Sequence, residues 1–141
     1  MGLLTFKGGV HPYDGKELSK DKPIKSVSPK GDLVYLLSQH IGAPAKPIVA
    51  KGDHVLAGQK IAEPGGFVSS PVHASVSGTV KAIEPRLTVT GAMVPAIIVE
   101  NDQKYEEVEF SGVEKVEDLS KDEVIKRIQE GGVVGMGGAG F

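Results

Sequence analysis

The chain contains no cysteine, which excludes disulfide bonds, thiol catalysis, zinc fingers and iron–sulfur ligation within its 141 residues. Tryptophan is also absent, and aromatic residues make up only 5% of the sequence. Basic and acidic residues nearly balance at 16 and 18, with no concentrated basic cluster, so we expect no nucleic-acid partner. No apolar run approaches the ~20 residues that span a bilayer, and the first ten residues lack the apolar centre of a signal peptide. We therefore expect a soluble piece without direct membrane insertion.

Glycine is abundant, with 19 residues. Together with proline it favours tight turns and short strands over long helices. Turn signals recur roughly every six to ten residues between positions 46 and 84, a spacing typical of a compact sandwich or barrel. Another strand is predicted at 92–100. Three further apolar residues at alternate or nearby positions suggest one more strand: Tyr105, Val108 and Phe110.

The sequence is predicted to divide into three parts. Residues 1–31 form an irregular arm, because a glycine pair and several prolines interrupt it, and we expect this arm to wrap over a core. Residues 32–111 form the β domain, whose first apolar segment at 32–39 fits either a strand or a helical turn. Residues 112–141 comprise a polar linker, a short helix and a glycine-rich end.

One helix is predicted over residues 120–129. Ser120 and Glu123 form a capping-box pattern, in which the serine oxygen accepts an N–H group of the first turn and the glutamate reaches back. Gly131 or Gly132 supplies a left-handed stop. Apolar residues recur at helical spacing: Val124, Ile125 and Ile128.

Two half-patterns within residues 51–83 give the most specific indication of the fold. The first contains Gly52-Asp53-x-Val55-x-x-Gly58, and the second contains Ser77-Gly78-x-Val80. Such a pair looks like the biotinyl/lipoyl carrier fold, a flattened barrel of two quasi-equivalent halves. The predicted fold class is therefore mainly β, a barrel-sandwich hybrid (biotinyl/lipoyl-like) domain with an irregular N-terminal arm and a short C-terminal helix. A generic small β barrel with glycine turns is the alternative.

The carrier function is not predicted to accompany this fold. A carrier domain displays a modified lysine at the tip of the hairpin that joins its halves. The joining segment here, residues 63–69, contains no lysine, and Lys60 and Lys81 lie in strand patterns away from the tip. Without an amine at the tip there is no group to acylate.

The last seven residues, Gly135-Met136-Gly137-Gly138-Ala139-Gly140-Phe141, form a second motif. Glycines allow a backbone to approach a phosphate closely and to point N–H groups at the anion. A dinucleotide fingerprint needs a strand before its glycines and a helix after them, whereas here a helix and Val133-Val134 precede the glycines. From the residues alone, the motif is either a phosphate-binding loop or a flexible glycine tail.

The remaining polar residues give no catalytic or metal site. The histidines at 11, 40, 54 and 73 form no pair at metal-ligand spacing, and we interpret them as turn and surface residues. The carboxylates between 100 and 109 fit a solvated strand face better than an acid–base pair in a cleft. We therefore predict no catalytic residue and no metal ligand in this piece.

Several segments together resemble one family. They are Phe6-Lys7-Gly8-Gly9-Val10-His11-Pro12, Gln39-His40-Ile41-Gly42-Ala43-Pro44, Gly66-Phe67-Val68-Ser69, the two half-patterns and the final glycine motif. In combination the chain is similar to the N-terminal part of the C subunit of the Rnf complex, an ion-pumping ferredoxin:NAD oxidoreductase. The resemblance runs over nearly the whole chain.

The resemblance implies a cofactor role for the final loop. This loop is similar to the Gly-x-Gly-Gly-Ala-Gly-Phe flavin loop of the NADH-oxidising subunit of respiratory complex I, which holds the FMN phosphate beside the nicotinamide site. Met136 occupies the variable position, which is often Arg in those relatives. The cofactor-binding residues that carry over are Gly135, Gly137, Gly138, Ala139, Gly140 and Phe141.

For the parent subunit, the resemblance implies FMN, NAD(H) and 4Fe–4S clusters, with 112–141 as the start of a truncated FMN/NADH-binding domain. This piece alone is expected to bind no cofactor and to be no enzyme, but a docking or structural domain. Its expected partners are the other subunits of a membrane electron-transport complex, with peripheral attachment on the cytoplasmic side of the cell membrane. The alternative is a stand-alone protein-interaction module on the same fold without the carrier lysine.

Overall fold

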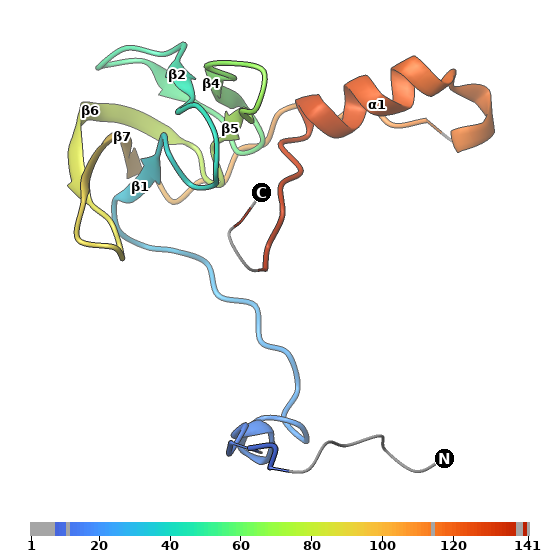
Figure 1. Ribbon diagram of the computed structural model, residues 1–141. Helices are drawn as coiled ribbons and strands as arrows, with labels where there is room; N and C mark the ends of the chain where they lie inside the picture. The colour runs from blue at the N-terminus through green and yellow to red at the C-terminus, as the bar shows by residue number, and fades with distance from the viewer. Residues whose placement is uncertain (1–7, 11, 114, 138–139, 141) are drawn as a thin grey trace.

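Two antiparallel sheets form the centre of the computed structural model, which describes residues 8–10, 12–113, 115–137 and 140 (Figure 1). The larger sheet has the order β1-β7-β6-β3, and the smaller has the order β2-β4-β5. The mainly β prediction is confirmed. The strands are β1 (Leu33–Leu36), β2 (Lys46–Pro47), β3 (His54–Val55), β4 (Lys60–Glu63), β5 (Val72–His73), β6 (Gly78–Leu87) and β7 (Met93–Asn101).

The hydrophobic core draws side chains from both sheets. It is built mostly from β-branched and small residues, in keeping with the scarcity of aromatics, and these residues suit a pleated, closely packed surface. Tyr35 brings an aromatic ring into this core, and its hydroxyl accepts the N–H of Ser75 at 2.9 Å, so its polar end is satisfied. The core cluster is Tyr35, Leu37, Ala45, Val55, Ile61, Ala62, Ala74, Val76, Val80, Ile97 and Val99.

The ambiguous segment at 32–39 is a strand, because Leu33–Leu36 pairs with β7 along its whole length. The further strand expected after β7 is wrong. The chain there makes only an isolated bridge between Ala57 and Glu107. Gln103 and Tyr105 have φ angles of 60° and 54°, and this left-handed backbone interrupts the extended geometry that a strand needs.

The predicted helix is confirmed as α1 (Lys121–Glu130), and its capping box is formed. The N–H of Glu123 donates to Ser120 Oγ at 3.3 Å, and the N–H of Ser120 donates to the Glu123 carboxylate at 2.8 Å. Gly132, with φ 71°, supplies the left-handed stop. None of the helical residues is buried, and α1 projects to one side of the sheets (Figure 1). Two short 3-10 turns accompany it in the chain, η1 (Lys16–Leu18) and η2 (Val116–Asp118).

The N-terminal arm leads away from the sheets (Figure 1), so the expectation that it wraps over the core is wrong. Every residue from 16 to 32 is exposed. Lysines and prolines separate its apolar residues, which leaves no continuous apolar face to bury. The arm is fixed where it meets β1, because the carbonyl of Pro29 accepts hydrogen bonds from Asn101 Nδ2 at 2.6 Å and from the Tyr105 hydroxyl at 2.7 Å. The boundaries at residues 31 and 111 stay a prediction.

Candidate functional site

The hairpin that joins the two halves, residues 63–69, is hydrogen-bonded to the segment before β2. The Ser69 hydroxyl donates to the carbonyl of Ala43 at 2.8 Å and accepts the N–H of Gly65 at 2.9 Å. A Cβ atom at Gly65 would lie 1.9 Å from the carbonyl oxygen of Pro44, so only glycine allows this approach. The hairpin is therefore a rigid feature.

The tip of this hairpin carries a phenylalanine. Phe67 is fully exposed, at 105% of its reference area. The two lysines nearest in the half-patterns lie elsewhere: Lys60 on β4 pairs with Glu130 at 2.5 Å, and Lys81 on β6 pairs with Asp32 at 2.7 Å. Neither Lys60 nor Lys81 lies at the tip, so the arrangement that a swinging arm requires is not formed.

The chain leaves α1 and returns across the β domain. A Cβ atom at Gly132 would lie 3.1 Å from the carbonyl oxygen of Pro71, which shows how closely the backbone crosses the residue before β5. Farther along, the carbonyl of Gly140 accepts the N–H of Ile41 at 3.3 Å. These two contacts place the glycine-rich end beside the hairpin and the turn after β1.

Three of the six predicted cofactor-binding residues are described by the structure. Gly137 and Gly140 lie in one turn, in which the N–H of Gly140 donates to the carbonyl of Gly137 at 3.1 Å. Gly135 lies at the edge of a groove described below. The other three, Gly138, Ala139 and Phe141, lie outside the described residues.

The described loop residues leave space beside their backbone, but one of their amides is already used within the loop. No atom of the described residues would lie within 4 Å of a Cβ atom at Gly137, and Gly140 has a left-handed φ of 67°. Met136 is fully exposed and supplies no charge. The amide of Gly140 is turned back onto Gly137, so its use by an anion would require this turn to open.

A groove of about 570 Å³ lies between the hairpin and the end of α1. We call it the tip groove. Sequence reasoning missed it, because its walls come from residues 40–41, 67–70 and 128–135, which meet only in three dimensions. The only sequence signal was a lone aromatic residue beside two glycines in the joining segment. Its lining is His40, Ile41, Phe67, Val68, Ser69, Ser70, Ile128, Gln129, Val133, Val134 and Gly135.

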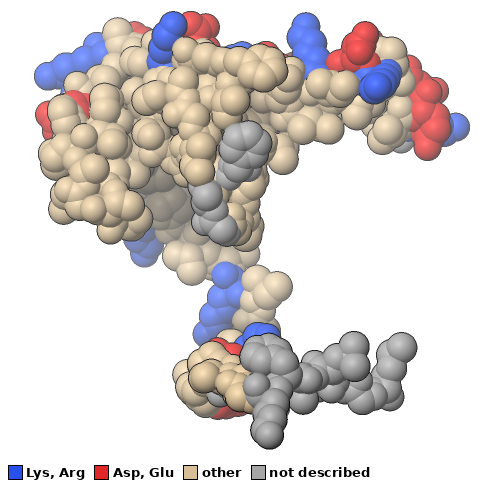
Figure 2. All heavy atoms as spheres, in the orientation of Figure 1, with Lys and Arg blue, Asp and Glu red and all other residues tan. Residues whose placement is uncertain are grey.

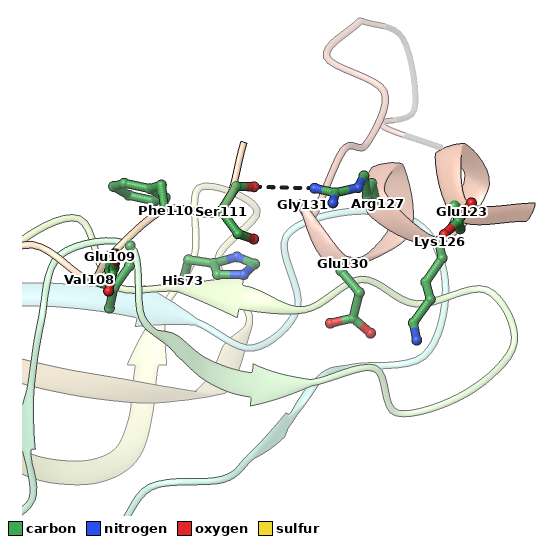
Figure 3. Close-up of a pocket in the computed structure, with 11 residues that line it drawn as sticks. His73, Val108, Glu109, Phe110, Ser111, Glu123, Lys126, Arg127, Glu130 and Gly131 are labelled. Carbon is green, nitrogen blue, oxygen red and sulfur yellow. Dashed lines mark hydrogen bonds between the residues drawn. The ribbon is translucent and has the colours of Figure 1, made fainter. Parts of the chain in front are cut away.

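A second cleft, of about 770 Å³, separates the barrel from the other side of α1 (Figure 3). Arg127 reaches across it and donates to the carbonyl of Ser111 at 3.2 Å. Lys60 forms a hydrogen bond to Glu130 and carries the opposite charge, and both effects hold the pKa of Glu130 below its usual value. Arg127 and Glu130 thus join α1 to the barrel, and we assign them a structural role.

Ser77, Asp102 and His54 lie together and carry the three side-chain types of a hydrolase. Their order differs from a catalytic triad, because the carboxylate is in the middle: Ser77 Oγ donates to Asp102 at 2.7 Å, and His54 Nε2 lies 3.1 Å from the other oxygen. The Ser77 residue is completely buried, so no substrate reaches its hydroxyl. We interpret this set as a structural bridge between β3, β6 and the loop after β7.

Within the described ranges, no three His, Cys, Asp or Glu side chains are close enough to share a metal ion. The described helices include none whose length and apolar character would suit a bilayer crossing.

Two antiparallel sheets around one core, with a hairpin between β4 and β5 that contains no lysine, define the fold as a barrel-sandwich hybrid. A family model described as the RnfC barrel sandwich hybrid domain matches residues 4–104. The chain belongs to this family, and the resemblance seen in the sequence is confirmed.

Curated relatives extend this similarity through the glycine-rich end. The C subunit of a Na(+)-translocating ferredoxin:NAD(+) oxidoreductase complex from Acetobacterium woodii is 43% identical over 97% of this chain. The C subunit of a proton-translocating ferredoxin:NAD(+) oxidoreductase complex from Clostridium ljungdahlii is 43% identical over 99%. The C subunit of an ion-translocating oxidoreductase complex from Vibrio cholerae is 36% identical over 99%. The chain spans 31% of the length of the first two relatives and 18% of the third.

Proposed function

We propose that this chain is the N-terminal part of a subunit that passes electrons between NAD(H), FMN and iron–sulfur clusters in a membrane ion-pumping complex. The relatives supporting this are named as C subunits of ion-translocating oxidoreductase complexes, and the similarity covers 97–99% of this chain, including the glycine loop. In this proposal the barrel-sandwich hybrid is a docking or structural domain, and residues 112–141 begin an FMN/NADH-binding domain.

The residues of this chain would hold the cofactor and would not react with it. A bound flavin supplies the chemistry, which is acceptance of a hydride and release of single electrons, while the protein positions and tunes it. Backbone groups of the glycine loop would hold the phosphate end. These residues are Gly135, Gly137, Gly138, Ala139, Gly140 and Phe141.

The exposed Phe67 and the neighbouring apolar residues of the barrel support a role in assembly. We propose that its partners are the other subunits of the membrane complex, and that it is attached peripherally on the cytoplasmic side. The 4Fe–4S clusters belong to the part of the parent protein outside this chain, since no cysteine occurs here.

The test replaces loop glycines in the full-length protein by Gly137→Val and Gly140→Val. We expect flavin content and NADH oxidation to fall by about tenfold or more, which corresponds to a loss of ~1.4 kcal/mol or more of binding. Gly112→Val is the matched control, because a Cβ atom there meets nothing within 4 Å and the residue lies in the linker. Retention of flavin and activity by both loop variants would refute the proposal.

A titration of FMN or NADH against the chain of residues 1–141 tests the division of labour. We expect no tight binding, because the rest of the cofactor domain is missing from this chain. Tight binding by this chain alone would contradict that expectation.

The alternative of a stand-alone interaction module is distinguished by the reading frame after Phe141, where a stop codon would favour the module and cysteine motifs would favour the redox subunit.

A further inference from the structure

We propose that the tip groove is the docking site for the polypeptide that follows the glycine loop in the full-length protein. This inference rests on the proposed function, in which the chain continues into an FMN/NADH-binding domain. Phe67 would be the anchor that enters that downstream domain, and α1 would be held between the two domains.

The chemistry of the groove suits an apolar protein surface. The described residues that line it include no Lys, Arg, Asp or Glu, whereas the cleft on the other side of α1 is lined by several charged residues. Figure 2 shows the same division, with charged residues along the outer edge of α1 and other residues along the side that faces the glycine-rich end. Exposed apolar residues of the groove are Ile41 (49%), Phe67 (105%), Val68 (41%), Ile128 (50%), Val133 (70%) and Val134 (44%).

The groove is organised before anything binds to it. Ser69 and Gly65 hold the hairpin in place, and the carbonyl of Val68 accepts the N–H of Ala43 at 2.8 Å. A Cβ atom at Gly42 would lie 2.2 Å from that same Val68 oxygen. Phe67 is thus presented on a fixed backbone, which reduces the entropy lost on docking, and rigid aromatic anchors of this kind dominate many interfaces.

The position of the chain end decides which occupant we favour. Gly135 lines the groove, and Gly140 is hydrogen-bonded to Ile41 on its rim, so a continuing polypeptide would start at the groove itself. The relatives from Acetobacterium woodii and Clostridium ljungdahlii are about three times as long as the matched stretch, which covers 31% of each. A domain tethered through a few residues has a high effective concentration at this site, so it would occupy the groove ahead of a free partner.

The test is hydroxyl-radical footprinting of the isolated full-length protein, with each residue's labelling referred to the same residue in the urea-unfolded chain. We expect labelling of Phe67 to be several-fold lower than in the unfolded chain. Ile24 is the internal control, because it is equally exposed, at 101%, and lies on the arm that leads away from the sheets, so it should stay as reactive as in the unfolded chain. Full labelling of Phe67 in the isolated full-length protein would overturn the inference.

Two other occupants give different results. Protection of Phe67 that appears only when other proteins of the complex are added would assign the groove to a separate protein, and protection that rises with the concentration of the isolated protein would assign it to a second copy. Either result overturns the inference.

Flavin content, measured on the same sample, separates the two proposals, because bound flavin with a labelled Phe67 refutes only the groove assignment. Absence of flavin with a protected Phe67 counts against the proposed function and supports the groove assignment.

A pair of variants adds a second readout. Phe67→Ser in the full-length protein should raise labelling of Ile128 and Val133 several-fold, because the anchor that closes the groove is lost. Ile24→Ser, the matched control on the exposed arm, should leave both unchanged. Equal labelling of Ile128 in the two variants would contradict the anchor role of Phe67.

Discussion

At the scale of single residues, Asp102 joins three segments of the β domain. Its carboxylate accepts hydrogen bonds from the Ser77 hydroxyl at 2.7 Å and from the N–H of Lys104 at 2.9 Å, and it lies 3.1 Å from His54 Nε2. Hydrogen bonds to a carboxylate favour its charged form. The Ser77 hydroxyl first, and the Lys104 amide next, lower the pKa of Asp102 from 3.8 to about 2.

Acid should therefore weaken the fold through Asp102. A carboxyl whose pKa is lower in the folded state contributes stability above its unfolded pKa of 3.8, and that contribution is lost as the pH falls towards about 2. Asp102→Asn should lower the thermal midpoint at neutral pH and remove this part of the acid dependence. Thermal melts by circular dichroism across that range measure it. Asp21→Asn, on the exposed arm, is the control, and identical acid slopes for the two variants would contradict the prediction.

At the scale of elements, the end signals of α1 should matter strongly, because none of its residues is buried and its links to the barrel include only the exposed contacts Lys60–Glu130 and Arg127–Ser111 among those described. Ser120→Ala removes the oxygen that accepts the N–H of Glu123, and loss of such a cap costs about 1 kcal/mol. We expect hydrogen exchange of the α1 amides to speed up by about fivefold, as that energy implies for local opening, while the β6 and β7 amides keep their rates. Ser120→Thr keeps an acceptor and should exchange like the original. Unchanged exchange in Ser120→Ala would show that tertiary contacts hold the helix.

The elements also show what the sequence allows one to predict. The α1 helix follows from local rules, since its cap, apolar spacing and glycine stop all lie within 13 residues, 120–132. The strand at 33–36 was ambiguous because its assignment depends on pairing with β7, more than 50 residues later in the chain. The segment after β7 is predicted as a strand from its apolar spacing, but that spacing does not indicate the left-handed backbone conformation of Gln103 and Tyr105, which prevents a strand there.

One part of the candidate site, the glycine loop, can be recognised from the sequence, and the other part, the tip groove, cannot. The glycine motif is recognisable in the sequence, while the cofactor role of its residues rests on the family resemblance and stays a prediction; Gly138, Ala139 and Phe141 lie outside the described part of the chain. The tip groove could not be predicted, because it forms only when the hairpin, the turn after β1 and the end of α1 meet. Long-range packing decides such surfaces, and local propensity does not report it.

At the scale of the whole molecule, the exposed arm and the hydrogen-bonded sheets should differ in their response to a protease. Brief trypsin treatment should cut first after Lys20 and Lys25, which lie on the arm, because cleavage needs an accessible and deformable backbone. Lys60 and Lys81, within strands β4 and β6, are the built-in controls and should be cut much later. Mass spectrometry of the products over time checks the order. Early cleavage after Lys81 would contradict this description of the sheets.

The sparse aromatic content has an optical consequence. Without tryptophan, the ultraviolet emission of the chain comes from three tyrosines at separate places: Tyr13 on the arm, Tyr35 in the core and Tyr105 at the anchor of the arm. Tyr35 is buried and hydrogen-bonded to Ser75, so its near-ultraviolet dichroism reports directly on whether the two sheets are packed. A flavin added to this chain would be observed in the visible range, with no indole emission to quench or to overlap.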